Sequence, residues 1–229
     1  MKFIKLIPLI TILYSSIVLS QGSGVNLAST RVIFDSMKEN SSLKVQNNSS
    51  NSLWLLRSWI STYDDDKKVT NFIITPPLYR IQPSESFQLR INKLDNTLPE
   101  EKESIFRINV LAIPPQSIDN KNSGLQFAIN NRIKLIYRPH NLNIPEKVTN
   151  AYKELQFLNS TNQVKVKNPT PYYITMDDVK INGKKVTSIN DFMVAPYSTL
   201  TIPEKNAKTL NYTTINDYGG KTPTQHIKF

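Results

Sequence analysis

The chain contains no cysteine and only two histidines among its 229 residues. Without cysteine it has no disulfide, no thiol nucleophile and no thiolate metal ligand. His140 and His226 lie far apart in the sequence, and neither has a second histidine or a carboxylate at metal-ligand spacing. The sequence also lacks a Gly-x-Ser-x-Gly elbow and a Walker phosphate loop. We therefore expect a protein that is not an enzyme and that binds no metal or cofactor.

Long hydrophobic runs are also missing, except for one at the N terminus. Lys2 and Lys5 precede a mostly apolar run, Leu6–Leu19, and the small residue Ser20 follows it. This order is typical of a secretory signal peptide. A transmembrane anchor is the alternative, but about 14 apolar residues are short for a bilayer and no charged flank follows. We expect residues 1–20 to be a cleaved signal peptide, and the mature chain to be exported and not inserted into a membrane.

The net charge is +10, of which Lys2 and Lys5 contribute two, so that the mature chain stands near +8 (10 − 2). A net positive charge of this size suits an anionic partner. The lysines are scattered along the sequence, however, and most of them fit a solvated surface. Aromatic residues do stand beside basic ones, as in Tyr79-Arg80 and Tyr137-Arg138. These aromatics fall at strand positions where core packing explains them, so we expect no nucleic-acid partner.

Residues 25–124 consist of short strand-like runs separated by turn residues. None of the runs shows a helical period over three turns, and seven or eight strands at this spacing predict an immunoglobulin-like sandwich. The first expected strand is Val25–Phe34. A second β-rich region follows a pause that contains Pro145, and its Asn182-Gly183 pair is the strongest hairpin signal in the chain. We expect an all-β protein with domains at 21–138 and 148–229 and a linker at 139–147.

The stretch Leu125–Pro139 predicts one unusually long strand. It has no glycine and no proline before its last position, and at about 3.3 Å per residue it would span roughly 45 Å. Leu125, Phe127 and Ile129 alternate on one face in its first half, whereas its second half carries Lys134 and other cations. From the alternation alone, the apolar residues would pack into the core of the first domain.

Six stretches stand out in order along the chain: STRVIFD at Ser29–Asp35, ITPPLYRIQP at Ile74–Pro83, LPEEKESIFRINVLAIPP at Leu98–Pro115, IKLIYRP at Ile133–Pro139, NPTPYYIT at Asn168–Thr175 and INDYGGK at Ile215–Lys221. Together they resemble the periplasmic chaperones of the chaperone–usher pilus pathway, the PapD-like family. The resemblance implies a boomerang of two immunoglobulin-like domains whose cleft receives a pilus subunit, lends it a missing strand and passes it to an outer-membrane usher. An exposed donor strand could also pair with a second copy of the free chaperone.

The resemblance assigns roles to particular residues. Arg31 and Lys134 match the cleft pair that binds the C-terminal carboxylate of the subunit. Leu125, Phe127 and Ile129 match the apolar residues that fill the open groove of the subunit, in place of the core packing that alternation favours.

Strict alternation puts Lys134 on the face opposite the apolar ladder. We therefore predict a bulge or a strong twist near Asn130-Asn131 that turns the strand.

Three further charges match a network between the domains in this family. They are Glu103, Arg138 and Asp217. Arg107 occupies a position that is usually aromatic in this family. The loop Gln116–Ser123 is short, which resembles the short-loop branch of the family.

A secreted immunoglobulin-like adhesion or structural module is the alternative function. It would use Asn-x-Ser/Thr sites such as Asn48 and Asn211 as glycan acceptors. The two functions differ at Arg31 and Lys134, because an adhesion module has no need for these two cations to share one cleft.

Overall fold

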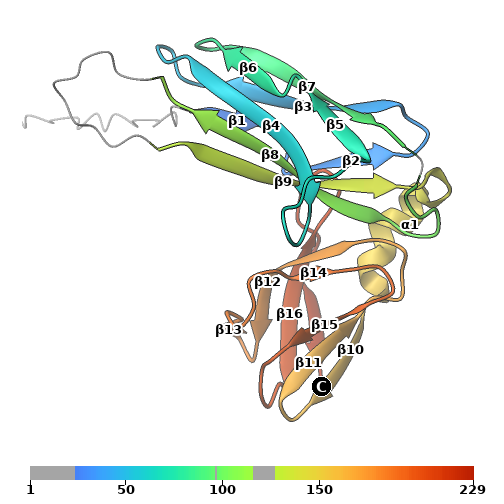
Figure 1. Ribbon diagram of the computed structural model, residues 1–229. Helices are drawn as coiled ribbons and strands as arrows, with labels where there is room; N and C mark the ends of the chain where they lie inside the picture. The colour runs from blue at the N-terminus through green and yellow to red at the C-terminus, as the bar shows by residue number, and fades with distance from the viewer. Residues whose placement is uncertain (1–23, 96, 116–126) are drawn as a thin grey trace, which may run out of the picture.

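The computed structural model of the protein describes residues 24–95, 97–115 and 127–229. The expected signal peptide at 1–20, the loop Gln116–Ser123 and Leu125 lie outside the described residues. Two β-sandwich domains meet at an angle (Figure 1). The predicted all-β class with two sandwich domains in a boomerang is confirmed. In the described parts of the chain, no helix has the length and apolarity needed to cross a membrane.

The first domain packs a four-stranded sheet, in the order β1-β3-β7-β5, against a five-stranded sheet, in the order β2-β9-β8-β4-β6. The strands are β1 (Val25–Leu27), β2 (Arg31–Asp35), β3 (Asn40–Asn47), β4 (Trp54–Thr62), β5 (Phe72–Thr75), β6 (Leu78–Ile81), β7 (Ser86–Lys93), β8 (Ser104–Ile113) and β9 (Ile129–Arg138).

The core between these two sheets contains a cluster of aromatic rings. The ring centroid of Phe72 lies 5.2 Å from those of Phe34 and Phe106, in edge-to-face pairs. Such pairs contribute roughly 0.5–1.5 kcal/mol beyond the burial of their area. Leu135 and Tyr137 of β9 belong to the same core, which anchors the C-terminal half of β9.

The expected single strand Val25–Phe34 is broken in the structure. β1 pairs with β3 in the smaller sheet, whereas β2 pairs in parallel with β9 in the larger one. The pairing of β2 begins at Arg31↔Lys134 and ends at Asp35↔Arg138. Residues 129–133 of β9 therefore have β8 on one side and, among the described residues, no strand on the other.

The predicted bulge at Asn130-Asn131 is wrong. β8 and β9 pair one to one without interruption, from Ser104↔Tyr137 to Ala112↔Ile129. Side chains on a regular strand alternate between faces, so Ile129 shares the face of the core residue Leu135 while Lys134 points to the other side. No turn of the strand is needed, because the ladder and the cation use opposite faces of one sheet.

The second domain contains a three-stranded sheet, β10-β11-β15, and a second sheet in the order β13-β12-β16-β17, with β14 also paired to β12. Its core includes Val164, Ile202 and Leu210, each completely buried. The strands are β10 (Gln156–Ser160), β11 (Gln163–Lys167), β12 (Ile174–Ile181), β13 (Lys184–Lys185), β14 (Met193–Val194), β15 (Thr199–Ile202), β16 (Thr209–Ile215) and β17 (Gln225–Lys228).

The Asn182-Gly183 hairpin forms as predicted. Ile181 pairs with Lys184, and the two turn residues have φ angles of 51° and 78°. Positive φ at both central residues is the requirement of the favoured two-residue hairpin turn, which Asn-Gly meets at little steric cost.

The segment between the domains is helical where a linker is expected. It consists of η1 (His140–Leu142), α1 (Pro145–Asn150) and η2 (Ala151–Glu154). Pro145 stands in the first turn of α1, where a missing backbone N–H breaks no helical hydrogen bond. The proline that interrupts the strand pattern therefore starts a helix.

A cationic cleft between the domains

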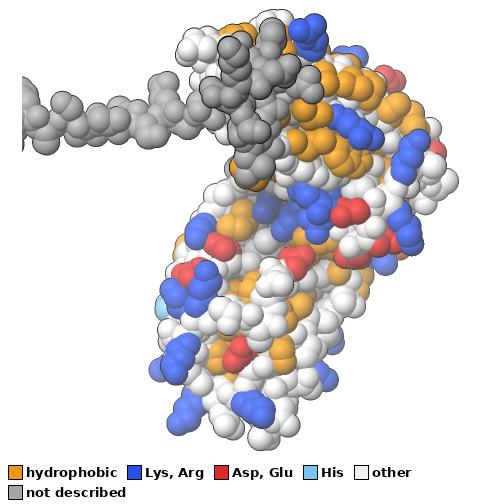
Figure 2. All heavy atoms as spheres, turned by 60° about the vertical axis from the view of Figure 1, so that its left-hand side comes forward, with side chains coloured by type: hydrophobic (Ala, Val, Ile, Leu, Met, Phe, Trp, Pro, Cys, Tyr) orange, Lys and Arg blue, Asp and Glu red, His pale blue; other side chains and the backbone are white. Residues whose placement is uncertain are grey.

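Three neighbouring strands of the first domain bring three cations side by side. Arg107 on β8 pairs with Lys134 on β9, and Lys134 pairs with Arg31 on β2. Adjacent strands lie about 4.8 Å apart, so these residues form a continuous row. Figure 2 shows basic side chains gathered where the two domains meet. We call Arg107, Lys134 and Arg31 the cation row.

Two members of the cation row reach across to the second domain. Nη1 of Arg31 donates to the carbonyl oxygen of Ile215 at 3.2 Å, and Nζ of Lys134 donates to Oγ1 of Thr175 at 3.3 Å. Thr175 and Ile215 are themselves paired between β12 and β16. The structure thus brings the predicted pair Arg31 and Lys134 together at the cleft.

These cations are poorly neutralised. Arg31 is only 7% exposed, and its Nε is buried with no hydrogen-bond partner among the described residues. Burial lowers the pKa of the Arg31 guanidinium, although the charge of Asp217 opposes this. Burial also lowers the pKa of Lys134 to about 8; Asp191 opposes this shift, while Arg31 and Arg107 add to it. A bound carboxylate would offset the cost of burying these charges and reduce the repulsion between them.

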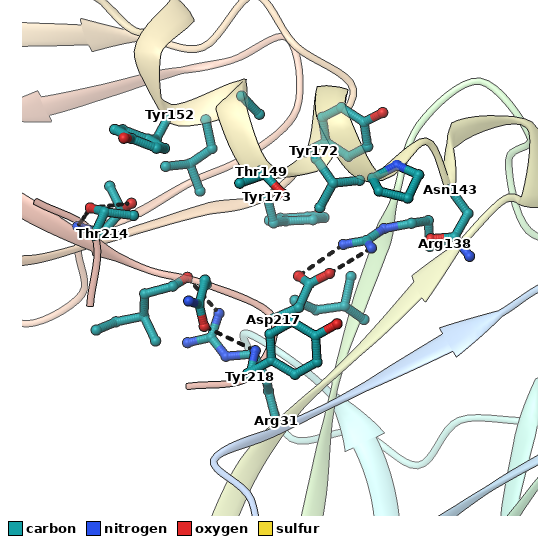
Figure 3. A pocket seen from close by; sticks show the side chains of 18 residues that line it. Arg31, Arg138, Asn143, Thr149, Tyr152, Tyr172, Tyr173, Thr214, Asp217 and Tyr218 are labelled. Carbon is teal, nitrogen blue, oxygen red and sulfur yellow. Dashed lines mark hydrogen bonds and ion pairs between the residues drawn. The ribbon is translucent and has the colours of Figure 1, made fainter. Parts of the chain in front are cut away.

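The predicted charge network closes the cleft at its Arg31 end. Arg138 donates through Nε to Oε1 of Glu103 at 2.6 Å, and through Nη1 and Nη2 to Asp217 at 2.7 and 3.0 Å. Glu103 also accepts the backbone N–H of Tyr173 at 2.7 Å. Figure 3 shows Arg138 facing Asp217, with Arg31 lining the same pocket. The volume of this pocket is about 250 Å³. One arginine therefore joins acids of both domains.

Burial and pairing act against each other in this network. Glu103 and Arg138 are 2% and 4% exposed. Burial raises the pKa of the Glu103 carboxyl, and the charge of Arg138 and the Tyr173 N–H offset part of the rise. For Arg138, burial lowers the pKa, but the hydrogen bonds and charges of Asp217 and Glu103 outweigh it. The network keeps its charges because nearly every polar atom has a partner.

The apolar ladder lies open to solvent. Phe127 is 67% exposed and Ile129 is 57% exposed, although the alternation of the strand alone favours core packing. Leu125 lies outside the described residues. Large apolar side chains beside an unpaired strand edge mark a surface that another strand can cover.

Two residues at the cleft were not found from the sequence, Tyr63 and Asp191. Oη of Tyr63 donates to Oδ2 of Asp191 at 2.7 Å, across 128 positions of sequence. The guanidinium of Arg107 lies 4.0 Å from the Tyr63 ring centroid, and its Nε donates to the Tyr63 carbonyl at 2.6 Å. The unusual arginine at 107 was the available signal, and the structure explains it as a stacking partner of Tyr63.

Two domain models of one protein family match the chain. Residues 24–143 match the family described as "Pili and flagellar-assembly chaperone, PapD N-terminal domain". Residues 150–226 match "Pili assembly chaperone PapD, C-terminal domain". The chain belongs to the PapD family of pilus assembly chaperones. Members of this family are not enzymes, which confirms the expected lack of catalysis.

Individual PapD-family relatives agree over nearly the whole chain. The probable fimbrial chaperone LpfB of Escherichia coli O157:H7 is 40% identical over 210 residues, 89% of each chain. The crystal structure of the periplasmic chaperone SfaE has 37% identity and a TM-score of 0.73, covering 90% of this chain and 98% of that one. A chain of the Salmonella enterica SafA pilin–SafB chaperone complex gives a TM-score of 0.79 at 28% identity, covering 90% and 97%.

Proposed function

We propose that this protein is a periplasmic chaperone that holds pilus subunits by donating strand β9 and delivers them to an outer-membrane usher. The observation that carries the proposal is the geometry of β9, whose open edge and exposed side chains run directly into the cation row. The relatives named as fimbrial and periplasmic chaperones support it, as does the structure of a chaperone with a pilin. They do not favour the alternative of an adhesion module.

Strand donation uses the free edge at residues 129–133. A subunit that lacks one strand has unpaired backbone groups and an open apolar groove, and such a surface aggregates. Pairing with β9 would satisfy the backbone groups, and Phe127 and Ile129, with Leu125 ahead of them, would enter the groove. Both partners gain, because the exposed ladder of the chaperone is covered in the same step.

Arg31 and Lys134 set where the subunit stops. A C-terminal carboxylate between them would accept charge-assisted hydrogen bonds worth roughly 1.5–3 kcal/mol each. It is a stronger acceptor than the Thr175 hydroxyl to which Lys134 donates in the free protein. The anchor fixes the register of the added strand, since a slip by one residue would turn every apolar side chain to the wrong face.

The same proposal includes the location and limits of the mature chain. Export through a cleaved signal peptide at 1–20 would deliver the protein to the periplasm, where the SfaE relative is described. We take 21–138 and 148–229 as the two domains and 139–147 as their connection. The free chaperone could also pair with a second copy through β9 until a subunit arrives.

Co-expression with a pilus subunit, followed by co-purification on a tagged chaperone, tests the proposal. Lys134→Ala should recover at least about tenfold less subunit than the wild type, because one charge-assisted contact is lost. Lys44→Ala is the matched control, since Lys44 is an exposed strand lysine of the same domain, and it should recover the wild-type amount. Equal recovery with Lys134→Ala and wild type would contradict the anchor.

A further inference from the structure

The two domains face each other with matching rows of residues. In the second domain, Thr175 on β12 pairs with Met193 on β14 and with Ile215 on β16. Arg31 of the cation row meets Ile215, and Lys134 meets Thr175. Met193 is the third residue of this row. Two residues before it, Asp191 accepts a hydrogen bond from Tyr63 of the first domain. This contact does not belong to the Arg138 network.

Both oxygens of Asp191 are held in place. Oδ2 accepts the Tyr63 hydroxyl at 2.7 Å, and Oδ1 accepts the backbone N–H of Met193 at 3.1 Å. Tyr63 is fixed in turn by Arg107, which stacks on its ring and bonds its carbonyl oxygen. A planar guanidinium suits this double contact, whereas a lysine ammonium cannot stack and bond in the same way.

We propose that Tyr63, Arg107 and Asp191 form a second junction between the domains, which holds the Lys134 end of the cleft and keeps the Asp191 carboxylate within electrostatic range of Lys134. The proposal rests on the proposed function, because it gives this junction the task of positioning one half of the subunit anchor. Tyr63 and Arg107 are positioning residues: they act through Asp191 and Lys134.

The placement of the junction gives it a different task from the Arg138 network. Arg31 lines one pocket with Arg138, so the Arg138 network supports the Arg31 end of the anchor. Lys134 lies between Arg31 on β2 and Arg107 on β8, and it faces Thr175 on β12. Arg31 and Arg107 are cations and Thr175 is neutral, so Asp191 supplies the negative charge that acts on Lys134. The junction therefore favours a protonated, correctly aimed Lys134 at the end that the Arg138 network does not reach.

Lysine-selective NMR titration of the free, full-length mature chaperone tests the junction without any subunit. Tyr63→Phe, Arg107→Lys and Asp191→Asn should each lower the pKa of Lys134 from its value of about 8, because the favourable carboxylate is released or removed. Arg107→Lys keeps the positive charge, so the change reports the lost stack. The matched control is Arg57→Lys, because Arg57 also lies over an aromatic ring, that of Trp59. Arg57 is on β4, on the same strand face as Ser61, which pairs with Arg107. This substitution should leave the pKa of Lys134 unchanged.

Subunit recovery is the second measurement. Tyr63→Phe and Arg107→Lys should recover about three- to tenfold less subunit, the usual effect of losing one hydrogen bond, while Arg57→Lys recovers the wild-type amount. Wild-type recovery with an unchanged Lys134 titration in both variants would overturn the junction even if Lys134→Ala abolishes binding. If the wild type recovers no subunit, the proposed function fails, whereas the titration still decides whether the junction exists.

Discussion

Glu103 and Arg138 are ionisable side chains with almost no exposure, and the structure shows how their charges are retained. Each oxygen of Glu103 accepts one hydrogen bond, from Arg138 and from the Tyr173 N–H, while Asp217 takes the other end of the guanidinium. A buried ion pair adds little net stability compared with a well-packed apolar pair, but removing one partner leaves an uncompensated charge. The network therefore specifies one arrangement of the domains more than it strengthens either domain.

Arg138→Gln should lower the free energy of unfolding by about 3–5 kcal/mol at pH 7, because it leaves the Glu103 carboxylate buried without its cation. Burial already raises the pKa of Glu103 above its ordinary value of 4.5, and the substitution raises it further. A raised carboxyl pKa means that the folded state binds the proton more tightly than the unfolded state, so stability falls as pH rises through that range. The deficit should be smaller at pH 5 than at pH 7 in denaturant unfolding.

Arg90→Gln provides the control for this substitution, because Arg90 is an exposed arginine on β7 of the same domain. It should change stability by less than about 0.5 kcal/mol at either pH. A deficit for Arg138→Gln that is equal at both pH values would argue against a charged Glu103 as its cause.

The two edges of strand β9 are paired to different extents. Its pairing with β8 runs over its whole length, but its pairing with β2 begins only at Lys134. Because β1 and β2 belong to different sheets, no other strand in the described part of the chain pairs with the first half of this edge. An open strand edge is normally a liability, and here it lies beside the exposed side chains of Phe127 and Ile129.

Replacing Phe127 and Ile129 together by serine should abolish subunit recovery and leave the free chaperone folded. Each side chain is mostly exposed, so the pair should change the free energy of unfolding by less than about 1 kcal/mol. The comparison is Leu78→Ser, a leucine of similar exposure on β6, at the opposite edge of the same sheet. If Leu78→Ser reduced recovery as strongly, general loss of surface hydrophobicity would explain the result and strand donation would not.

The whole molecule consists of two separate hydrophobic cores joined by polar contacts. Neither core cluster contains a residue of the other domain among the described residues. Arg138 pairs with Asp217, and Glu103 accepts the N–H of Tyr173. Arg31 and Lys134 donate to residues of β16 and β12, and Tyr63 donates to Asp191. Interfaces of this kind permit relative motion unless specific contacts prevent it, so the angle of the cleft depends on a few side chains.

Asp217→Asn should loosen the angle without disturbing either core. It removes a charged, two-pronged hydrogen bond worth about 1.5–3 kcal/mol. We expect the calorimetric transitions of the two domains to separate and small-angle scattering to show a broader range of interdomain distances. Asp178→Asn is the control, because Asp178 pairs with the nearby Lys180 on the same strand, β12, within the second domain. Identical scattering for Asp217→Asn and wild type would assign the angle to other contacts.

Local chemistry in the sequence determined a large part of this protein. Alternation and turn residues predicted both sandwiches and the Asn182-Gly183 hairpin. The family resemblance supplied Arg31 and Lys134, and the structure places them on neighbouring strands. These features are readable because each depends on the residue type and its nearest neighbours, or on motifs that keep their order along the chain.

Tertiary structure alone decided which strand edge stays open and what faces the cation row. The pattern of Val25–Phe34 contains no sign that the segment changes sheets, and the bulge predicted at Asn130-Asn131 is replaced by a regular ladder. The contact of Tyr63 with Asp191 joins residues 128 positions apart. A strand pattern records which side chains alternate, but the choice of partner strand and the meeting of two domains arise only when separate surfaces pack together.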